Sequence, residues 1–289
     1  MSAPLDLRPL EEAVQRALGA ADPGELEILG YGEISIVVRW HEHACKRLPV
    51  FTEPARLEAY RRCLADYLAE LTTLGVGPLE TRLETVELPG GALAAYSVQP
   101  VLRPEDLLPR RFATCAPAEA EWLFDLVLGR VYAAVSARVG LDGQLSNWAM
   151  RDGELVYLDV STPMLRDEAG RELLDLELFL AALPWAARGL VRRTLLRTIL
   201  DKYYQPRGVV LDLLGNLHKE RLGSLVPRLV ERANAHASPP FTEEEVRRYY
   251  AGDARSWALM QWLRRVDRAW QRGVRRRVYP FLLPGAYVR

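Results

Sequence analysis

The sequence contains almost no lysine. Of its 38 basic residues only Lys46, Lys202 and Lys219 are lysines, and all the others are arginines. Lysine carries a compact point charge, whereas arginine carries a planar fork of donors. In a chain that uses arginine nearly everywhere, a lysine can therefore mark a position that needs the compact charge.

The sequence also lacks net charge and long apolar runs. Its 38 acidic residues balance its 38 basic ones, which predicts neither a nucleic-acid nor a membrane partner. The most apolar stretch, residues 178–191, is interrupted by Pro184 and Arg188 and is too short to span a bilayer. Residues 1–19 contain three acids and do not read as a signal peptide. We therefore expect a cytoplasmic protein.

Two classes of site are absent. The three cysteines, Cys45, Cys63 and Cys115, are scattered without metal-ligand spacing, which predicts reduced thiols and not a disulfide framework or a zinc site. No Gly-Lys-Ser or Gly-Lys-Thr occurs, so a P-loop is excluded.

Hydrophobic periodicity predicts an α+β fold in two unequal parts. The first, residues 1–98, combines a leading helix, strands and one long helix; strands are predicted at 26–29, 34–40, 44–48, 81–88 and 93–98, and helices at 4–20 and 54–74. Residues 99–102 form a predicted hinge. The second part, residues 103–289, is mostly helical, with a loop and hairpin at 140–163. The hairpin is predicted to turn at 151–153, and Thr242 to Glu245 carry the signal of a helix cap.

A glycine-containing loop lies between the first two predicted strands. Gly30, Gly32 and Ser35 would let backbone amides approach a phosphate closely. A strand follows this loop, whereas a helix would follow a dinucleotide-binding fingerprint. Lys46 lies on the next predicted strand and is a candidate phosphate-binding cation. The long helix offers Glu58 or Asp66 as its carboxylate partner, and we favour Glu58.

Three oxygen-bearing side chains follow the second-part helix predicted at 118–139. Asp142 and Asn147 lie five residues apart in a loop, and a hairpin at 148–158 can return Asp159 beside Asn147. Amide and carboxylate oxygens suit Mg²⁺. Asp142 could take a proton from an acceptor hydroxyl. The three residues together predict a phosphoryl-transfer site.

The order of these motifs resembles that of the protein-kinase-like superfamily, nearest its aminoglycoside-phosphotransferase and RIO-kinase branches. The resemblance covers residues 26–163, and the rest matches only as a helical lobe. It implies a two-lobed fold that binds ATP and Mg²⁺. Its residue roles are as follows: Gly30, Gly32, Ser35 and Lys46 would contact the phosphates, Asp142 would be catalytic, Asn147 and Asp159 would hold the metal, and the hinge at 97–102, with Gln99, would meet adenine.

The chain departs from the superfamily pattern at two motifs. Gly140 and Leu141 stand where a His-Gly or His-Arg pair usually precedes the catalytic aspartate. The metal-binding triplet is Asp159-Val160-Ser161, closer to small-molecule kinases than to regulated protein kinases. The missing histidine removes a usual brace of the catalytic loop, so a pseudokinase stays open.

We expect an ATP-dependent phosphotransferase that acts on a hydroxyl of a small molecule. The alternatives are a Ser/Thr kinase of a protein or peptide, a nucleotide-binding pseudokinase or scaffold, and an unrelated α+β protein with an accidental motif order. The sequence specifies neither the acceptor nor the oligomeric state. If Asp142, Asn147 and Asp159 lay far apart in the structure, the order of the motifs would be accidental.

Two C-terminal segments have no assigned role. Residues 255–277 contain eight arginines and one acid, interleaved with tryptophans. This pattern predicts a helix packed on the protein with a solvated arginine face, or a docking surface for an anionic ligand. Residues 218–221 read as a polar helix end.

Overall fold

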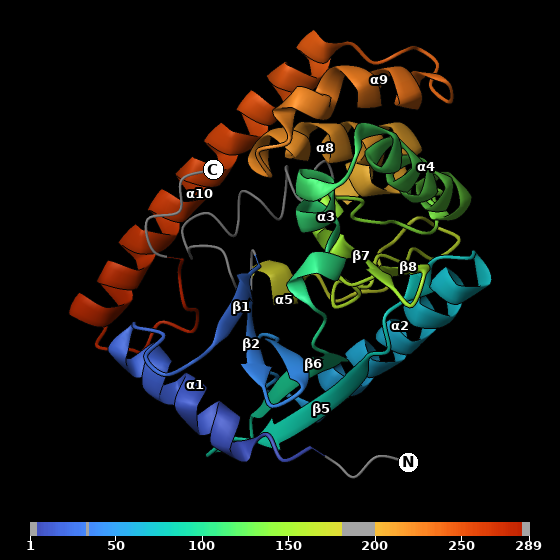
Figure 1. Cartoon of the computed structure of the whole chain (residues 1–289). Helices are drawn as coiled ribbons and strands as arrows, with labels where there is room; N and C mark the ends of the chain where they lie inside the picture. The colour runs from blue at the N-terminus through green and yellow to red at the C-terminus, as the bar shows by residue number, and fades with distance from the viewer. Residues whose placement is uncertain (1–4, 33–34, 181–199, 285–289) are drawn as a thin grey trace.

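The computed structural model describes residues 5–32, 35–180 and 200–284. The fold is mixed α+β, with a β-rich N-terminal region and a mostly helical C-terminal region, as Figure 1 shows. No helix in these ranges has both the length and the apolar character needed to cross a membrane.

The N-terminal region is built on an antiparallel five-stranded sheet. Its strand order is β1-β2-β3-β6-β5. The strands are β1 (Ile28–Tyr31), β2 (Ile36–Trp40), β3 (His43–Arg47), β5 (Arg82–Glu87) and β6 (Leu93–Pro100). Each corresponds to a predicted strand within a few residues. In β3, Lys46 pairs with Val37 of β2 and Ser97 of β6, so the lysine lies on the central strand of the sheet.

The leading helix α1 (Arg8–Ala20) packs its apolar side against this sheet. A buried polar cluster fixes the contact. Glu11 of α1 accepts two hydrogen bonds from Arg47 of β3, at 2.8 and 2.9 Å, and a third from the hydroxyl of Tyr96. Arg47 directly follows Lys46, and successive strand residues point to opposite faces. The helix therefore holds β3 from the face opposite Lys46.

Helix α2 (Pro54–Thr73) connects the two regions. Proline is tolerated in the first helical turn, which explains the start at Pro54. After the helix, β4 (Gly77–Pro78) pairs in parallel with β8 of the second sheet. The chain thus contributes a short strand to the C-terminal region before it returns to the first sheet.

The second sheet has the order β4-β8-β7. Strands β7 (Trp148–Arg151) and β8 (Glu154–Tyr157) form the predicted hairpin. At its turn Asp152 has φ +52° and Gly153 has φ +85°, the left-handed pair that a tight two-residue hairpin requires. The prediction of a hairpin turning at 151–153 is confirmed.

Helices make up most of the remaining chain. They are η1 (Pro104–Asp106), α3 (Leu108–Thr114), α4 (Pro117–Ala134), η2 (Leu145–Asn147), α5 (Glu177–Leu180), η4 (Lys202–Tyr204), α8 (Pro206–Lys219), η5 (Gly223–Leu225), α9 (Val226–Asn234) and α10 (Glu243–Gly273). Helix α10 runs along one edge of the molecule in Figure 1. Its predicted cap is confirmed, because the Thr242 hydroxyl accepts a hydrogen bond from the Glu245 amide at 3.1 Å.

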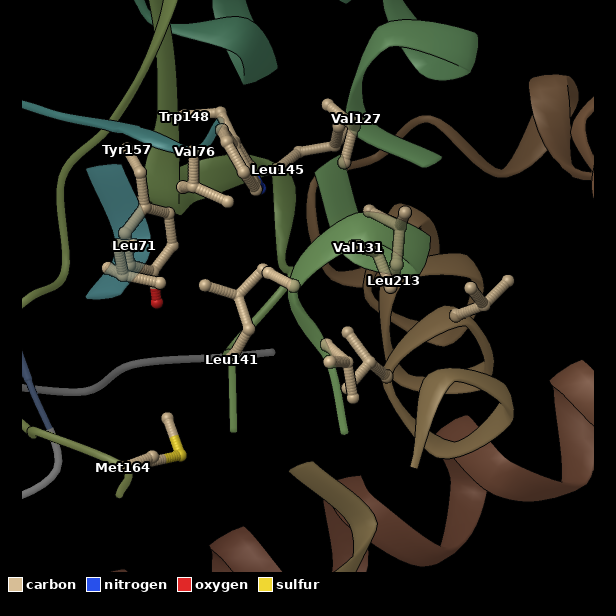
Figure 2. Packing of buried hydrophobic residues seen from close by; sticks show 14 of the residues in the cluster. Leu71, Val76, Val127, Val131, Leu141, Leu145, Trp148, Tyr157, Met164 and Leu213 are labelled. Carbon is tan, nitrogen blue, oxygen red and sulfur yellow. The ribbon is translucent and has the colours of Figure 1, made fainter. Parts of the chain in front are cut away.

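One large apolar cluster joins the two regions. Figure 2 shows side chains of α2, α4, α8, the second sheet and the 141–145 loop packed together. The indole of Trp148 and the ring of Tyr157 belong to this cluster, with their centroids 4.9 Å apart. Both side chains are fully buried. The loop that carries Asp142 is therefore anchored in the core of the protein.

Candidate functional site

The loop that carries Asp142 is held at both ends by apolar residues. Leu141 and Leu145 are 0% and 1% exposed, and Figure 2 shows both among the core side chains. Between them, Gly143 touches α8, since a Cβ there would lie 2.6 Å from Cγ1 of Val209. The leucines leave the polar residues between them at the edge of the core, directly beside α8.

Two buried tyrosines of α2 brace this part of the chain. The Tyr67 hydroxyl donates to the Gly140 carbonyl at 2.9 Å, and the Tyr60 hydroxyl donates to the Ser161 carbonyl at 2.8 Å. The first bond supports the loop directly before Asp142. Tyr67 thus braces the loop from α2, at Gly140, where the resemblance to the protein-kinase-like superfamily would lead us to expect a histidine.

Lys46 reaches Asp159 across 113 residues of chain. Its Nζ lies 2.7 Å from Oδ1 of Asp159, which also accepts a bond from the Ser161 hydroxyl at 3.0 Å. Burial alone would raise the pKa of Asp159, but the Lys46 charge and these bonds outweigh it and lower the pKa. Asp159 is therefore ionised at neutral pH, and the pair joins β3 to the segment after β8.

Asn147 lies between the two aspartates. Its carbonyl accepts a hydrogen bond from the amide of Leu158 at 2.8 Å, which places it beside Asp159. Its side-chain Nδ2 donates to the Asp142 carbonyl at 3.1 Å. The structure thus gathers Asp142, Asn147 and Asp159 in one place.

Asp142 differs from Asp159 in its electrostatic surroundings. Its Oδ1 accepts a hydrogen bond from the backbone amide of Gln144 at 3.2 Å. Burial and the negative charges of Asp212 and Asp159 raise the pKa of Asp142 to about 7, against the smaller lowering effects of that amide and of Lys202. Two carboxylates near each other whose pKa values move in opposite directions are suited to different chemical roles.

Part of the glycine loop lies beside Lys46. A Cβ at Gly32 would lie 3.0 Å from the Ser35 hydroxyl and 3.8 Å from Cε of Lys46. Within the described part of the chain, the Ser35 hydroxyl is buried without a hydrogen-bond partner. Most buried hydroxyls in proteins are hydrogen-bonded, so the Ser35 hydroxyl has a free hydrogen-bonding capacity beside Lys46. Gly30 lies on β1 with no atom near its Cβ position, and residues 33–34 lie outside the described residues.

The predicted partner of Lys46 is wrong. The Glu58 side chain is 60% exposed and its carboxylate lies 3.6 Å from Arg61 of the same helix. Asp66 is exposed as well. Helical periodicity separates two faces of α2. The face toward the site carries Tyr60 and Tyr67, and the face toward solvent carries Glu58 and Asp66.

Strand β6 extends into the predicted hinge. Strand β6 continues to Pro100, so Ser97 and Gln99 belong to the sheet. The Gln99 side chain donates to the Thr81 hydroxyl at 3.0 Å and to the Leu158 carbonyl at 2.8 Å. The Gln99 side chain therefore ties β6 to the segment before Asp159, and contact of the hinge with adenine stays a prediction.

A family model matches residues 9–268 of the sequence, about nine-tenths of the chain. The chain belongs to the Family of unknown function (DUF6206). A search of curated proteins finds no match. The matched range of this DUF6206 protein contains every site residue described above, as well as most of α10.

Several polar residues of the DUF6206 site were missed in the sequence. Asp212, in the middle of α8, is 1% exposed. It accepts hydrogen bonds from Lys202 Nζ at 3.1 Å, Tyr249 at 2.5 Å and the Gln144 side chain at 3.2 Å. Lys219 Nζ donates to the Gln144 side-chain oxygen at 3.2 Å. The scarcity of lysine and the seven-residue spacing of Asp212 and Lys219, which places them on one helix face, could have revealed this group.

The protein oxygens at this site would bind Mg²⁺ only together with the phosphates of a bound nucleotide. Among the described residues no three His, Cys, Asp or Glu side chains gather as a metal site. Asn147 and Asp159 offer one amide and one carboxylate oxygen. Mg²⁺ is commonly held by one or two carboxylates together with substrate phosphates and water. The residues present therefore fit a magnesium ion that arrives with a nucleotide.

The Arg- and Trp-rich segment 255–277 in this DUF6206 chain begins within α10. Four of its apolar residues are about half exposed: Leu259, Trp262, Val266 and Trp270. Polar side chains on the other side of the helix, Gln261, Arg264 and Asp267, are buried instead. Of the two alternatives for this segment, the helix packed on the protein is wrong for these four positions, and the docking surface for an anionic ligand stays a prediction.

Proposed function

We propose that this protein is an ATP-dependent phosphotransferase with a protein-kinase-like fold, in which the β-rich and helical regions are the two lobes. The observation that carries the proposal is the 2.7 Å contact between Lys46 of the sheet and Asp159 of the second region. It brings a cation and a metal-type ligand from distant parts of the sequence to one point, beside Asn147 and Asp142.

The roles of the residues follow from their charges. When ATP binds, the Lys46 ammonium would leave Asp159 and contact the phosphates. Gly30, Gly32 and Ser35 would lie beside the phosphates, and the unpartnered Ser35 hydroxyl supports this assignment. Asn147 and Asp159 would hold Mg²⁺, which would neutralise charge on the phosphates.

Asp142 would act on the acceptor. The acceptor oxygen attacks the γ-phosphorus, the bond from that phosphorus to the β,γ-bridging oxygen breaks, and ADP leaves. The hydroxyl proton passes to Asp142. A carboxylate with a pKa near neutrality is suited to accept it. The Tyr67 bond to the Gly140 carbonyl supports a competent loop without a histidine.

Nucleotide binding and turnover test the proposal separately. Binding of Mg·ATP is followed by thermal shift, and turnover by release of ADP in the presence of small hydroxyl compounds and Ser- or Thr-containing peptides. We expect Asp159→Asn to lose the stabilisation by Mg·ATP. Asp142→Asn should keep it but lose turnover by about 100-fold or more.

The matched control is Asp152→Asn. This aspartate is 92% exposed in the hairpin turn, at a left-handed position that asparagine tolerates, so neither readout should change. Full turnover in both Asp142→Asn and Asp159→Asn would refute the phosphotransferase. Binding of Mg·ATP without turnover on any acceptor would leave only a nucleotide-binding protein.

A further inference from the structure

All three lysines of the chain meet at the candidate site. Lys46 reaches it from β3, Lys202 from η4 and Lys219 from the last turn of α8. Every other basic residue of the chain is an arginine. The helical region thus brings two compact positive charges to the loop that carries Asp142, in addition to the one that the sheet supplies.

Lys219 differs from the other two lysines in how its charge is balanced. Lys46 and Lys202 each contact a carboxylate oxygen, at 2.7 and 3.1 Å. Lys219 contacts the neutral amide oxygen of Gln144, and the nearest carboxylate in the described part of the chain is Glu220, at 4.0 Å. Its side chain is 19% exposed. An ammonium group that is mostly removed from water and weakly paired attracts an anion.

Gln144 is held in the orientation that directs its oxygen to Lys219. Its Nε2 lies 3.2 Å from Oδ2 of Asp212 and 3.5 Å from Oδ2 of Asp142. A carboxylate can only accept and an ammonium can only donate, so the amide nitrogen must face the aspartates and the oxygen must face Lys219. Lys202 in turn fixes Asp212. Lys219 is therefore separated from Asp142 by one amide group.

We propose that Lys219, oriented by Gln144, is the anion-binding subsite for the acceptor. This inference rests on the proposed function, in which Asp142 takes the proton of the acceptor hydroxyl. An anionic group held by Lys219 would lie close to Asp142, while Lys46 serves the nucleotide. The substrate class is then a hydroxyl compound that carries a phosphate or carboxylate group. A polycationic acceptor such as an aminoglycoside would be disfavoured by the same charge.

Chemical labelling of lysines tests the subsite directly, because the chain has only three. The full-length protein is acetylated briefly, and modification at each lysine is measured by mass spectrometry. The nucleotide site is first filled with Mg²⁺ and a non-hydrolysable ATP analogue, and inorganic phosphate is then added against sodium chloride of equal ionic strength. We expect the analogue to protect Lys46. Phosphate at ten times its dissociation constant should slow labelling of Lys219 about tenfold, with Lys202 unchanged as an internal control.

The outcomes separate this inference from the proposed function. Unchanged labelling of Lys219 in phosphate would overturn the subsite, and so would protection of Lys219 by the nucleotide analogue alone, since Lys219 would then serve the donor. Protection of Lys219 by phosphate with no protection of Lys46 by the analogue would keep the anion site and refute the nucleotide site.

A variant pair gives a second readout. Lys219→Gln should weaken phosphate binding, measured by ³¹P NMR titration, by about tenfold or more. Arg247→Gln, which removes an arginine that is 66% exposed and paired with Glu244, should leave it unchanged. In turnover, Lys219→Gln should raise KM for an anionic acceptor and leave KM for Mg·ATP unaltered. Equal phosphate binding by both variants would count against the subsite.

Discussion

Replacement of Asp142 by asparagine should stabilise the protein while it abolishes the proposed activity. Burial and the charges of Asp212 and Asp159 raise the pKa of Asp142 from 3.8 to about 7. The unfolded chain ionises this carboxyl at its ordinary pKa, whereas the folded protein resists ionisation up to neutral pH. Above pH 7 the folded state therefore carries an unfavourable charge that asparagine, of nearly the same shape, does not.

The magnitude follows from the same numbers. Each pH unit between the two pKa values corresponds to about 1.4 kcal/mol, so the gap from 3.8 to about 7 sets an upper limit of about 4 kcal/mol. Asp142 keeps some contact with solvent, which reduces this figure. We expect Asp142→Asn to raise the free energy of unfolding by about 1–3 kcal/mol at pH 8 and by little near pH 4.

Urea unfolding between pH 4 and 8.5, without Mg²⁺ or nucleotide, measures the effect. The matched control is Asp159→Asn, which should act in the opposite direction. The pKa of Asp159 is lowered by Lys46, so its stabilisation is present above pH 3.8 and is lost as the pH falls through its lower folded pKa. At neutral pH this variant should lose about 1.5–3 kcal/mol. An Asp142→Asn protein that is less stable than the parent at pH 8, or a difference independent of pH, would refute the reasoning.

Two further predictions concern the support of the loop. Gly143→Ala should destabilise the protein by about 1–3 kcal/mol through overpacking against Val209, and Val209→Ala should recover part of that loss when the two are combined; additive effects in thermal unfolding would contradict the close contact. Tyr67→Phe should cost about 1–3 kcal/mol because the buried Gly140 carbonyl loses its hydrogen-bond donor. It should also lower kcat more than it raises KM for Mg·ATP, and unchanged kcat would argue against the bracing role.

Local patterns predicted the elements well. The hairpin at 148–158, the start of α2 at Pro54 and the cap at Thr242 depend on interactions between residues a few positions apart. Such interactions are largely determined by propensity and turn chemistry. The spacing of Asp142, Asn147 and Asp159 was similarly readable, because a short hairpin returns the chain to its starting point.

Side-chain partners were predicted less well. The sequence favours Glu58 as the partner of Lys46 because Glu58 lies on the helix that follows, but the packing of Tyr60 and Tyr67 in the core sets the rotation of α2 about its axis. The change in composition after Gln99 predicts a hinge there, yet β6 continues through Gln99 and pairs with β3. Nearness in the sequence did not identify the partner, whereas the apolar spacing of α2, which places Tyr60 and Tyr67 on its buried face, excludes Glu58 and Asp66 from that face.

By itself the sequence determined the α+β class, the order of strands and helices, and the residue types that could bind a phosphate and a metal. Only the tertiary structure decided that Lys46 meets Asp159, that Tyr67 braces the loop, and that Lys202 and Lys219 join the site through Asp212 and Gln144. The physical reason is range. Turn and helix formation depend on neighbours in the chain. These contacts join residues 68 to 113 positions apart and depend on how buried apolar faces pack against each other.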